Sequence, residues 1–559
     1  MNKKVQMFLL SSFLLFQSFR CLAVVGWELP ATDLSDNNLI SAFPQVGIDS
    51  AGNAIAIWQK WVGESTYAVQ SRTYDSSADL WLTTTQLTPP ATNQLKPQIA
   101  MNPAGNAIAV WERKDDVTGK DTIQAARYTA TSGWLPTTID LSDNTQDASD
   151  PQIAIDEAGN AIAVWDRNSV IQARRYDVNT DSWSATTNLS TVLANVAQIA
   201  MDPSGNGIAV WIGLVGINNI IQTKRYGFFS DSWSAATNLS TTGQNADEAQ
   251  IAMDTTSNGI AIWKRNNGAN FIIQTKRYDS ETGLWSATTN LSAAGQNGIS
   301  PQITMNPTGN GIAVWYRSDG ANYIIQTKRY DATTDTWSAL ATDLSIAGQD
   351  ATRPQIDTND DGDAITVWQR WDGSNWIIQT KNYEVTKNEW SDITTDLSAT
   401  GKSSSRAQIA VNAAGKAVSV WQREDDDTGN EVIQAALYFP PIPPTPTPPL
   451  AAPTNLTAIK KCLRFPTQTD LIHCLTWDTV ENATKYRIYV DASASQQILD
   501  IADDENVASK FDINLGVKIA ETTNECIEIR KRCSGTQITY YVVGVDDDGN
   551  NGQAASVTI

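Results

Sequence analysis

The stretch QIAMDPSGNGIAVW at residues 198–211 decides the fold, because close copies of it recur along the chain. Residues 302–315 read QITMNPTGNGIAVW, and residues 98–111 read QIAMNPAGNAIAVW. Eight copies align, and their tryptophans stand 46 to 54 residues apart, at Trp58, Trp111, Trp165, Trp211, Trp263, Trp315, Trp368 and Trp421. A period of this length indicates a repeat architecture in which each copy is one structural unit.

Each unit reads as four short strands, which we call A to D. Strand A is the QIAMD stretch, strand B the GIAVW stretch, strand C the IIQTKRY stretch and strand D the WSATTNLS stretch. Their Val, Ile, Thr, Trp and Tyr residues favour strands, and the apolar run of strand B predicts burial on both faces. A turn such as residues 203–206 joins A and B, and Gly205 and Asn206 tolerate positive φ there. Four strands in each unit predict one blade of a β-propeller.

The two ends of the repeat region predict a closed ring. The last unit supplies strand A, strand B and a strand C that ends at Tyr438, but prolines stand where its strand D should follow. Residues 26–35, GWELPATDLS, match the strand D sequence TWSALATDLS at 336–345. We therefore expect the N-terminal strand to complete the last blade, which removes free sheet edges. The predicted fold for residues 24–439 is an all-β, closed, eight-bladed propeller.

Tryptophan and glutamine recur at fixed places in the units. Besides the eight strand B tryptophans, eight more open strand D, at Trp27, Trp81, Trp134, Trp183, Trp233, Trp285, Trp337 and Trp390. We expect these sixteen rings to fill the space between blades. A glutamine lies four residues before the strand C tyrosine in every unit, from Gln70 to Gln434, and we expect it to satisfy buried backbone groups.

The segment from strand C to strand D resembles kelch repeats. In RYDATTDTWSAL (329–340) a Tyr-Asp pair ends one strand and a tryptophan opens the next, and residues 175–186 repeat this arrangement. The double glycine that follows the second strand of a kelch unit is absent, and a tryptophan followed usually by arginine stands there instead. The resemblance covers this one segment of each unit and implies a propeller, without implying a kelch function.

The N-terminus predicts export. Lys3 and Lys4 precede an apolar stretch at 7–16 that is short for a membrane span, so residues 1–23 read as a signal peptide with cleavage after Ala23. A lipoprotein signal at Cys21 is the alternative, which the bulky Arg20 disfavours. We expect a secreted, periplasmic or cell-surface protein, without membrane insertion after cleavage. The formal net charge of −21 repels phosphate backbones, so we do not expect nucleic acid as a partner.

The C-terminal part differs in composition from the repeats. A proline-rich stretch predicts a semi-rigid linker at 440–452. No cysteine occurs between Val24 and Lys461, and four follow at Cys462, Cys474, Cys526 and Cys533. In an exported protein they predict two disulfides, and of three connectivities we favour Cys462–Cys474 with Cys526–Cys533.

Residues 453–559 resemble a fibronectin type III domain. The resemblance rests on APTNLTA, on LTWDTVENATKYRIYVD and on ITYYVVGVDDDGNNGQAASVTI. It places Trp477 at the core tryptophan position and Tyr540 and Tyr541 near the tyrosine corner. Segment 492–535 is longer than the family pattern. The resemblance implies a β-sandwich that serves as a spacer or an adhesion module.

Loop lengths differ between the two faces of the predicted propeller. The step from the strand A glutamine to the strand B tryptophan is 13 in every unit, and the C-to-D step is 7 with one exception of 6. The B-to-C step varies from 7 to 13 and the D-to-A step from 15 to 18. Because binding residues commonly lie on variable loops of a rigid scaffold, we assign ligand binding to the B–C/D–A face.

Aromatic and polar residues in the B–C loops are the candidate ligand contacts. They are Trp61, Phe271, Tyr323, Trp371, Asp372 and Trp376. Aromatic faces stack on sugar rings, and carboxylates and amides bond sugar hydroxyls. The alternative for Phe271, Tyr323 and Trp376 is packing against the next blade, whereas we expect Trp61 and Trp371 to be exposed.

The sequence contains few residues in patterns typical of catalytic or metal-binding sites. His473 is the single histidine, which excludes a Ser–His–Asp triad in the repeats. Carboxylates at 115–116 and 425–427 occupy equivalent loops and read as solvated charge. Calcium at 359–363 or 546–552 would lack EF-hand spacing. A sialidase-like enzyme would need Asp-box turns, which are absent, and we find no position that breaks the symmetry of the scaffold. We expect no cofactor.

The preferred interpretation is a monomeric, exported, non-enzymatic binding or adhesion protein whose ligand is a glycan or a protein. One alternative is a carbohydrate-active enzyme, sialidase-like or otherwise based on carboxylates. The other is a structural protein of the cell envelope that binds proteins.

Overall fold

The computed structural model describes residues 26–441, apart from 64–65, 89–92 and 192, and the backbone of the strands between 457 and 558. The chain divides into two units, Met1–Pro441 and Ile442–Ile559, and the division falls inside the predicted linker. The predicted signal peptide lies outside the described residues. Within the described part, no helix is long and apolar enough to cross a membrane.

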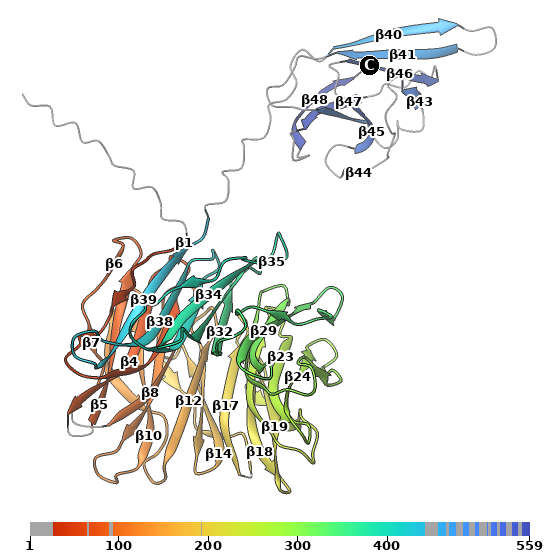
Figure 1. Ribbon diagram of the computed structural model, residues 1–559. Coiled ribbons are helices and arrows are strands. Elements are labelled where there is room, and N and C mark those ends of the chain that lie inside the picture. Colours follow the sequence, from red (N-terminus) through yellow and green to blue (C-terminus); the bar gives the residue numbers. More distant parts are fainter. Residues whose placement is uncertain are drawn as a thin grey trace, which may run out of the picture. The chain divides into compact units, whose positions relative to one another are not determined.

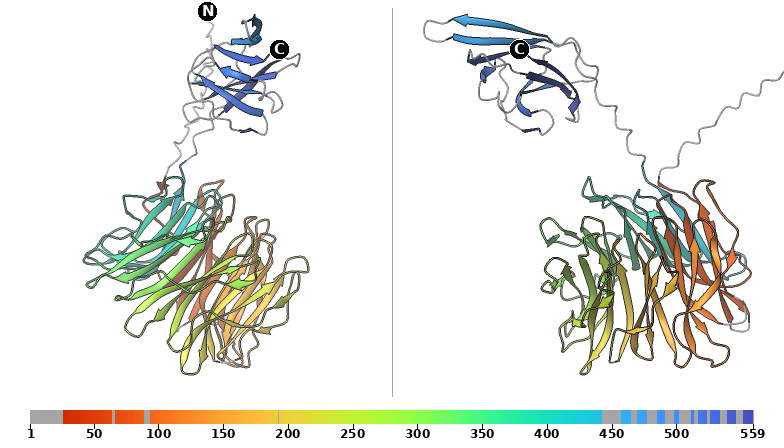
Figure 2. Two further views of the ribbon diagram at one scale, coloured as in Figure 1. Left: turned by 90° about the vertical axis from the view of Figure 1, so that its right-hand side faces the viewer. Right: turned by 180° about the vertical axis from the view of Figure 1, so that it is seen from behind.

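The first unit is a ring of eight antiparallel sheets, each a blade with strands in the order A-B-C-D (Figures 1 and 2). We number the blades by their strand A. The A strands of consecutive blades are neighbours, and the last of them contacts the first, so the ring is closed around a central channel. The A strands are β3 (Ser41–Ile48), β8 (Gln94–Met101), β12 (Ala148–Ile155), β17 (Ala194–Met201), β22 (Ala246–Met253), β27 (Gly298–Met305), β32 (Ala351–Thr358) and β37 (Ser404–Val411).

The B strands form the core of the ring. They are β4 (Ala54–Gly63), β9 (Ala107–Lys114), β13 (Ala161–Arg167), β18 (Gly207–Val215), β23 (Gly259–Asn266), β28 (Gly311–Ser318), β33 (Ala364–Trp371) and β38 (Ala417–Glu424). All eight strand B tryptophans are 0% exposed. Trp211, for example, packs with Ile162 and Val164 of the preceding blade, which confirms that these rings fill the space between blades.

The C strands carry the repeated glutamine. They are β5 (Thr66–Asp75), β10 (Asp121–Thr129), β14 (Val170–Asp177), β19 (Asn218–Gly227), β24 (Phe271–Asp279), β29 (Tyr323–Asp331), β34 (Trp376–Glu384) and β39 (Glu431–Phe439). The prediction that the glutamine serves backbone groups is wrong. Gln222 Oε1 accepts from the indole of Trp211 at 3.2 Å, and its Nε2 donates to Asn238 of strand D at 2.8 Å. In blades 3, 4, 5 and 8 the glutamine instead joins side chains of strands B, C and D. In blades 2, 6 and 7 it donates to the strand D residue.

Strand D is broken into two pairs of residues in seven blades. The pieces are β6 (Leu80–Trp81) and β7 (Thr85–Gln86), β15 (Ser182–Trp183) and β16 (Thr187–Asn188), β20 (Ser232–Trp233) and β21 (Thr237–Asn238), β25 (Leu284–Trp285) and β26 (Thr289–Asn290), β30 (Thr336–Trp337) and β31 (Thr342–Asp343), β35 (Glu389–Trp390) and β36 (Thr395–Asp396), and β1 (Gly26–Trp27) and β2 (Thr32–Asp33). Blade 2 alone has a continuous strand, β11 (Gly133–Asp140). In blade 4 the hydroxyl of Ser234 accepts from the backbone N–H of Arg225 at 3.0 Å, which replaces a ladder bond.

The N-terminal residues close the ring as predicted. β1 and β2 both pair with β39, so they are strand D of blade 8 (Figure 1). The hydroxyl of Ser35 accepts from the N–H of Ile433 at 2.9 Å, as Ser240 does for Ile221 in blade 4. Leu34 is 1% exposed and packs between blades 8 and 1.

The A–B turns are held by an acidic or amide side chain at the end of strand A. In blade 4, Asp202 Oδ1 accepts from the N–H of Asn206 at 2.9 Å, and Gly205 has φ +89°. Of the two residues that tolerate positive φ here, only Gly205 adopts it, and the side-chain amide of Asn206 donates to Asp202 Oδ2 at 2.9 Å.

The second unit contains two antiparallel sheets. One has the order β40 (Thr457–Arg464), β41 (Thr469–Thr476), β46 (Cys526–Arg532), β43 (Ile498–Ile501). The other has the order β44 (Phe511–Asp512), β45 (Gly516–Thr522), β42 (Lys485–Val490), β47 (Thr539–Val545), β48 (Asn551–Thr558). The predicted disulfides and the calcium segment at 546–552 concern side chains outside the described set.

Candidate ligand-binding site

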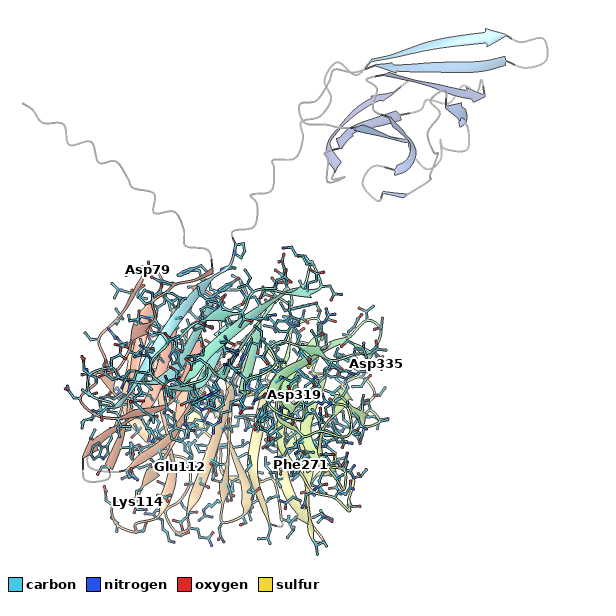
Figure 3. All side chains as sticks on the ribbon, in the orientation of Figure 1. Asp79, Glu112, Lys114, Phe271, Asp319 and Asp335 are labelled. Atoms are coloured by element: carbon cyan, nitrogen blue, oxygen red, sulfur yellow. The ribbon has the colours of Figure 1, made fainter. Side chains whose placement is uncertain are left out.

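The two faces of the propeller differ in their loops and in where the chain enters and leaves. Figure 3 shows Lys114, at the B–C end of its blade, far from Asp79, which lies in a C–D turn. Gly26 pairs with Phe439 at the C–D end, so the chain enters and leaves the propeller on that face. The B–C/D–A face is therefore free of both connections.

Three predicted contacts come together in one hairpin of blade 7. Trp371 ends β33, Trp376 begins β34, and their ring centroids lie 5.7 Å apart at 65°. Both rings are half-buried. Between them, Asp372 Oδ1 accepts from the N–H groups of Ser374 and Asn375, each at 2.8 Å. These bonds hold the pKa of Asp372 below its ordinary value and make it the residue that shapes the loop.

Tyr323 and Phe271 pack within their own blades. The Tyr323 ring lies 5.2 Å from that of Tyr316 on the adjacent strand, and Lys264 Nζ lies 4.8 Å above the Phe271 ring. The backbone N–H of Phe271 is bonded to Asn297, which precedes strand A of the next blade. The rings thus rest on strand B of their own blade, while the backbone is tied to the next one.

Trp61 stands apart from the other candidates. It faces Tyr67 across the hairpin of blade 1 and is half-buried, as is Trp371. The two rings that we expected to be exposed are therefore only partly accessible. The six candidates lie on one face but are spread over blades 1, 5, 6 and 7.

A different set of residues, not found from the sequence, surrounds the channel mouth. Every A strand has a β-bulge two residues before its glutamine, and the bulge residue has a φ between 47° and 56°. We call these residues the bulge ring. In blade order they are Phe43, Lys96, Asp150, Val196, Glu248, Ser300, Arg353 and Arg406. Because strand A starts from the D–A loop, the bulge ring lies toward the B–C/D–A face.

The bulge ring breaks the eightfold symmetry, which corrects the expectation that no position does. The scaffold fixes the backbone of the bulge in each blade, but seven kinds of side chain occupy the eight positions, and only arginine occurs twice. The signal was visible in the sequence as a variable position two residues before each strand A glutamine. Periodicity alone did not show that this position bulges at the channel.

On one side of the bulge ring the charges neutralise one another. Lys96 Nζ lies 2.7 Å from Asp150 Oδ1 and 3.1 Å from Glu112 Oε1. Glu248 Oε1 lies 2.8 Å from Lys264 Nζ, and its Oε2 accepts from the N–H of Ser300 at 2.7 Å. This side is a set of closed ion pairs.

On the other side, over blades 6, 7, 8 and 1, the charges are unpaired. A cavity of about 300 Å³ is lined there by Ser300, Arg353, Arg406 and Phe43. The Arg406 guanidinium carbon lies 4.0 Å from the centroid of the Phe43 ring. The strand A glutamines of the same four blades, Gln302, Gln355, Gln408 and Gln45, also line the cavity.

One further residue of an A strand breaks the symmetry. Asp357 lies on β32, two residues beyond Gln355, where five other blades have alanine. Its Oδ2 accepts from the N–H of Val411 at 2.8 Å, and its Oδ1 accepts from that of Thr358 at 2.9 Å. Burial raises the pKa of Asp357 to about 6.

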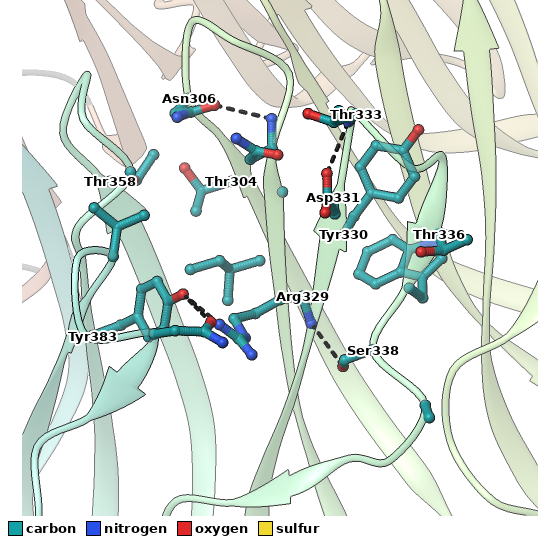
Figure 4. A pocket seen from close by; sticks show the side chains of 18 residues that line it. Thr304, Asn306, Arg329, Tyr330, Asp331, Thr333, Thr336, Ser338, Thr358 and Tyr383 are labelled. Carbon is teal, nitrogen blue, oxygen red and sulfur yellow. Dashed lines mark hydrogen bonds between the residues drawn. The ribbon is translucent and has the colours of Figure 1, made fainter. Parts of the chain in front are cut away.

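Two hollows larger than the cavity at the channel mouth belong to the scaffold. A groove of about 540 Å³ lies between blades 6 and 7 on the A–B/C–D face, where Arg329 donates to the hydroxyl of Tyr383 (Figure 4). An equivalent groove of about 380 Å³, with Arg225 and Tyr278, lies between blades 4 and 5. Because these grooves repeat with residues that join blades, they follow from the symmetry. A third hollow, of about 480 Å³, lies between the B–C and D–A loops of blades 3 and 4 and is lined by Val170, Leu193 and Leu214.

Metal ligands do not cluster in the described part of the chain, where no group of three His, Cys, Asp or Glu residues converges. In the segment 359–363, Asn359 Oδ1 accepts from the N–H groups of Gly362 and Asp363, at 2.9 and 2.8 Å. This segment forms the A–B turn of blade 7 in the way of the other blades.

Comparisons with known proteins do not identify a family or a function for this chain. No protein-family model matches the chain, and no match was found among the curated proteins. The β-propeller domain of the Trilobed protease from Pyrococcus furiosus is 7% identical, with a TM-score of 0.40, over 65% of this chain and 98% of that one. The Dos1 propeller is 10% identical, with a TM-score of 0.41, over 74% and 94%. The polysaccharide lyase Uly1 is 6% identical, with a TM-score of 0.42, over 76% and 94%.

Proposed function

We propose that the chain is an exported, non-enzymatic binding protein that presents a glycan-binding surface on the B–C/D–A face of the propeller. The observation that supports this proposal is that the positions that differ between blades gather on one face of the propeller. Strand B tryptophans and A–B turns repeat in all eight blades, whereas the aromatic hairpins and the unpaired side of the bulge ring occur in few blades and on one face. A ligand site on a repeat scaffold needs such positions, because packing does not dictate their side chains.

The remaining features complete this proposal. Residues 1–23 would direct export, and the acidic composition supports a soluble monomer that avoids nucleic acid. The C-terminal unit would be a fibronectin type III-like spacer or second contact, since its strand order of β40-β41-β46 in one sheet and β45-β42-β47-β48 in the other suits such a sandwich. The kelch-like C–D segments would serve the scaffold.

The test is a glycan array probed with the full mature chain and with a Trp61→Ala/Trp371→Ala variant. Phe229→Ala is the matched control, because Phe229 is 94% exposed in a C–D turn on the opposite face. We expect binding that the double variant loses and the control keeps. A blank array would reject glycan binding and favour a protein ligand or an envelope role, to be sought by pull-down from envelope extracts.

One observation favours a second function, that of a carbohydrate-active enzyme. Asp357, on an inner strand, has a pKa of about 6, which is suitable for a general acid. Hydrolysis of a chromogenic glycoside panel, lost in Asp357→Asn, would replace the binding function with this one. Binding without turnover would leave the first proposal in place.

A further inference from the structure

We propose that Arg353, Arg406 and Phe43, at the mouth of the central channel, bind the carboxylate or sulfate group of an acidic saccharide. This inference deepens the glycan-binding function proposed above and rests on it. We call the three residues the arginine arc.

The arginine arc stands out because its charges have no partner. Within the part of the chain that the structure describes, neither Arg353 nor Arg406 forms an ion pair or a side-chain hydrogen bond. The charged members of the ring on blades 2, 3 and 5 all have a partner within 3.1 Å. Arg353 is exposed and Arg406 is half-buried. Two adjacent cations without an ion-pair partner, in a chain of net charge −21, can attract an anion.

The electrostatics around Arg406 agree with this view. Burial lowers the pKa of Arg406, and the neighbouring Arg353 lowers it further, while Glu431 acts in the opposite direction. Glu431 itself accepts from Gln422 Nε2 at 2.8 Å and lies beyond ion-pair distance of Arg406. An oxyanion placed between the two guanidinium groups would relieve their repulsion.

Phe43 positions one of the two arginines. Its ring stacks against the guanidinium of Arg406, with the guanidinium carbon 4.0 Å from the ring centroid. Stacking occupies the flat face of a guanidinium and leaves the N–H donors at its edge free. Those donors match the two oxygens of a carboxylate or sulfate.

The lining of the cavity favours a saccharide over other anions. The four strand A glutamines have no side-chain hydrogen bond to another described residue, so their amides are available to hydroxyl groups. The cavity of about 300 Å³ is at the small end of ligand sites, which suits one sugar residue. A polyanion would meet the acidic groups of the remaining surface, so we infer one charged sugar unit on an otherwise neutral glycan.

The experiment compares three sugars that differ at one carbon: glucose, glucuronate and glucose 6-sulfate. Calorimetric titration of the full mature chain should give binding of an acidic sugar at least tenfold tighter than that of glucose. Whether glucuronate or glucose 6-sulfate binds more tightly identifies the group as carboxylate or sulfate. Arg353→Gln/Arg406→Gln should abolish the preference, and Arg406→Lys, which keeps the charge without the stacked fork, should reduce it.

Lys96→Gln is the matched control, since it removes one positive charge from the same ring at a paired position. It should keep the preference for the acidic sugar, and a melting curve checks that every variant is folded. A preference that survives in the double glutamine variant, or that Lys96→Gln removes equally, would overturn the inference.

The outcomes separate this inference from the proposed function. Glycan binding that requires Trp61 and Trp371 but shows no acidic preference leaves the function standing and rejects the arginine arc as the site. Binding of triglutamate in place of any sugar rejects the saccharide and indicates an acidic peptide. An array and titrations without any sugar binding reject both.

Discussion

Asp357→Asn should stabilise the propeller at neutral pH and remove part of its pH dependence. The folded chain raises the pKa of Asp357 from its ordinary 3.8 to about 6, because the carboxylate of this half-buried residue lies between blades 6 and 8 and loses part of its hydration. The folded state therefore holds a proton that the unfolded state releases between pH 4 and 6. The free energy of unfolding consequently falls as the pH rises through that window.

The size of the effect follows from the pKa change. One pKa unit corresponds to about 1.36 kcal/mol, so the change from 3.8 to about 6 costs the folded state about 3 kcal/mol above pH 6. Asparagine avoids this cost but can accept from only one of the two N–H groups, of Val411 and Thr358, that the carboxylate serves. Losing one such bond costs about 1 kcal/mol. We expect a net gain of about 2 kcal/mol at pH 7.5 and a net loss at pH 4.

The assay is thermal unfolding followed by tryptophan fluorescence from pH 4 to 8, for the original chain and the variant. The difference in melting temperature should change sign at about pH 4.5, where the cost of the raised pKa equals the lost hydrogen bond. Asp331→Asn is the control, because hydrogen bonds lower the pKa of that exposed carboxylate, which gives any pH effect the opposite sign. A melting-temperature difference that is constant over this pH range would refute the argument that Asp357 has a raised pKa.

Three further predictions follow from the scaffold. Leu34→Ala should lower the free energy of unfolding by about 2 to 5 kcal/mol, because Leu34 is 1% exposed. Leu189→Ala in blade 3 is the matched control, since Leu189 is also 1% exposed and should cost as much. A much smaller loss for Leu34→Ala in denaturant unfolding would mean that the ring is not firmly closed. Arg225→Met should cost about 0.5 to 1 kcal/mol, since its guanidinium lies 4.5 Å from the Tyr278 ring centroid, and a neutral result in thermal unfolding would show that this stack contributes no stability. Non-reducing peptide mapping should recover Cys462 linked to Cys474 and Cys526 linked to Cys533, and free thiols or crossed pairs would contradict the predicted connectivity.

The sequence was sufficient for the architecture because the repeat carries both packing and closure. A tryptophan that recurs in every unit is buried in every blade, and an orphan strand D at residues 26–35 has only one place to pair. Local hydrogen bonding was less predictable. Ser234 interrupts strand D by bonding backbone, and Gln222 serves a tryptophan and an asparagine, because both contacts depend on the pairing of strands C and D.

The candidate site was predicted only in part. Loop variability indicates the face that carries the aromatic hairpins, but it does not show that Trp371 rests on Trp376 or that Asp372 is committed to its turn. The bulge ring could not be predicted from the sequence pattern, for a physical reason. A residue at positive φ leaves the alternation of its strand, so the pattern of strand A gives no sign that Arg353 and Arg406 face a channel.

This bulge explains how a symmetric ring can carry an asymmetric site. The side chain of the strand B tryptophan is fixed, because it is buried against the preceding blade. At the bulge the backbone is held by neighbours instead: the N–H of Phe43 donates to Gln422 of blade 8 at 2.9 Å, and that of Lys96 to Gln59 of blade 1 at 3.0 Å. The side chains of Phe43, Arg353 and Arg406 then line the cavity at the channel mouth. A change at Arg353 or Arg406 alters the channel mouth without removing an ion pair or a hydrogen bond between described residues, so this side of the bulge ring is where such a scaffold can acquire a ligand specificity.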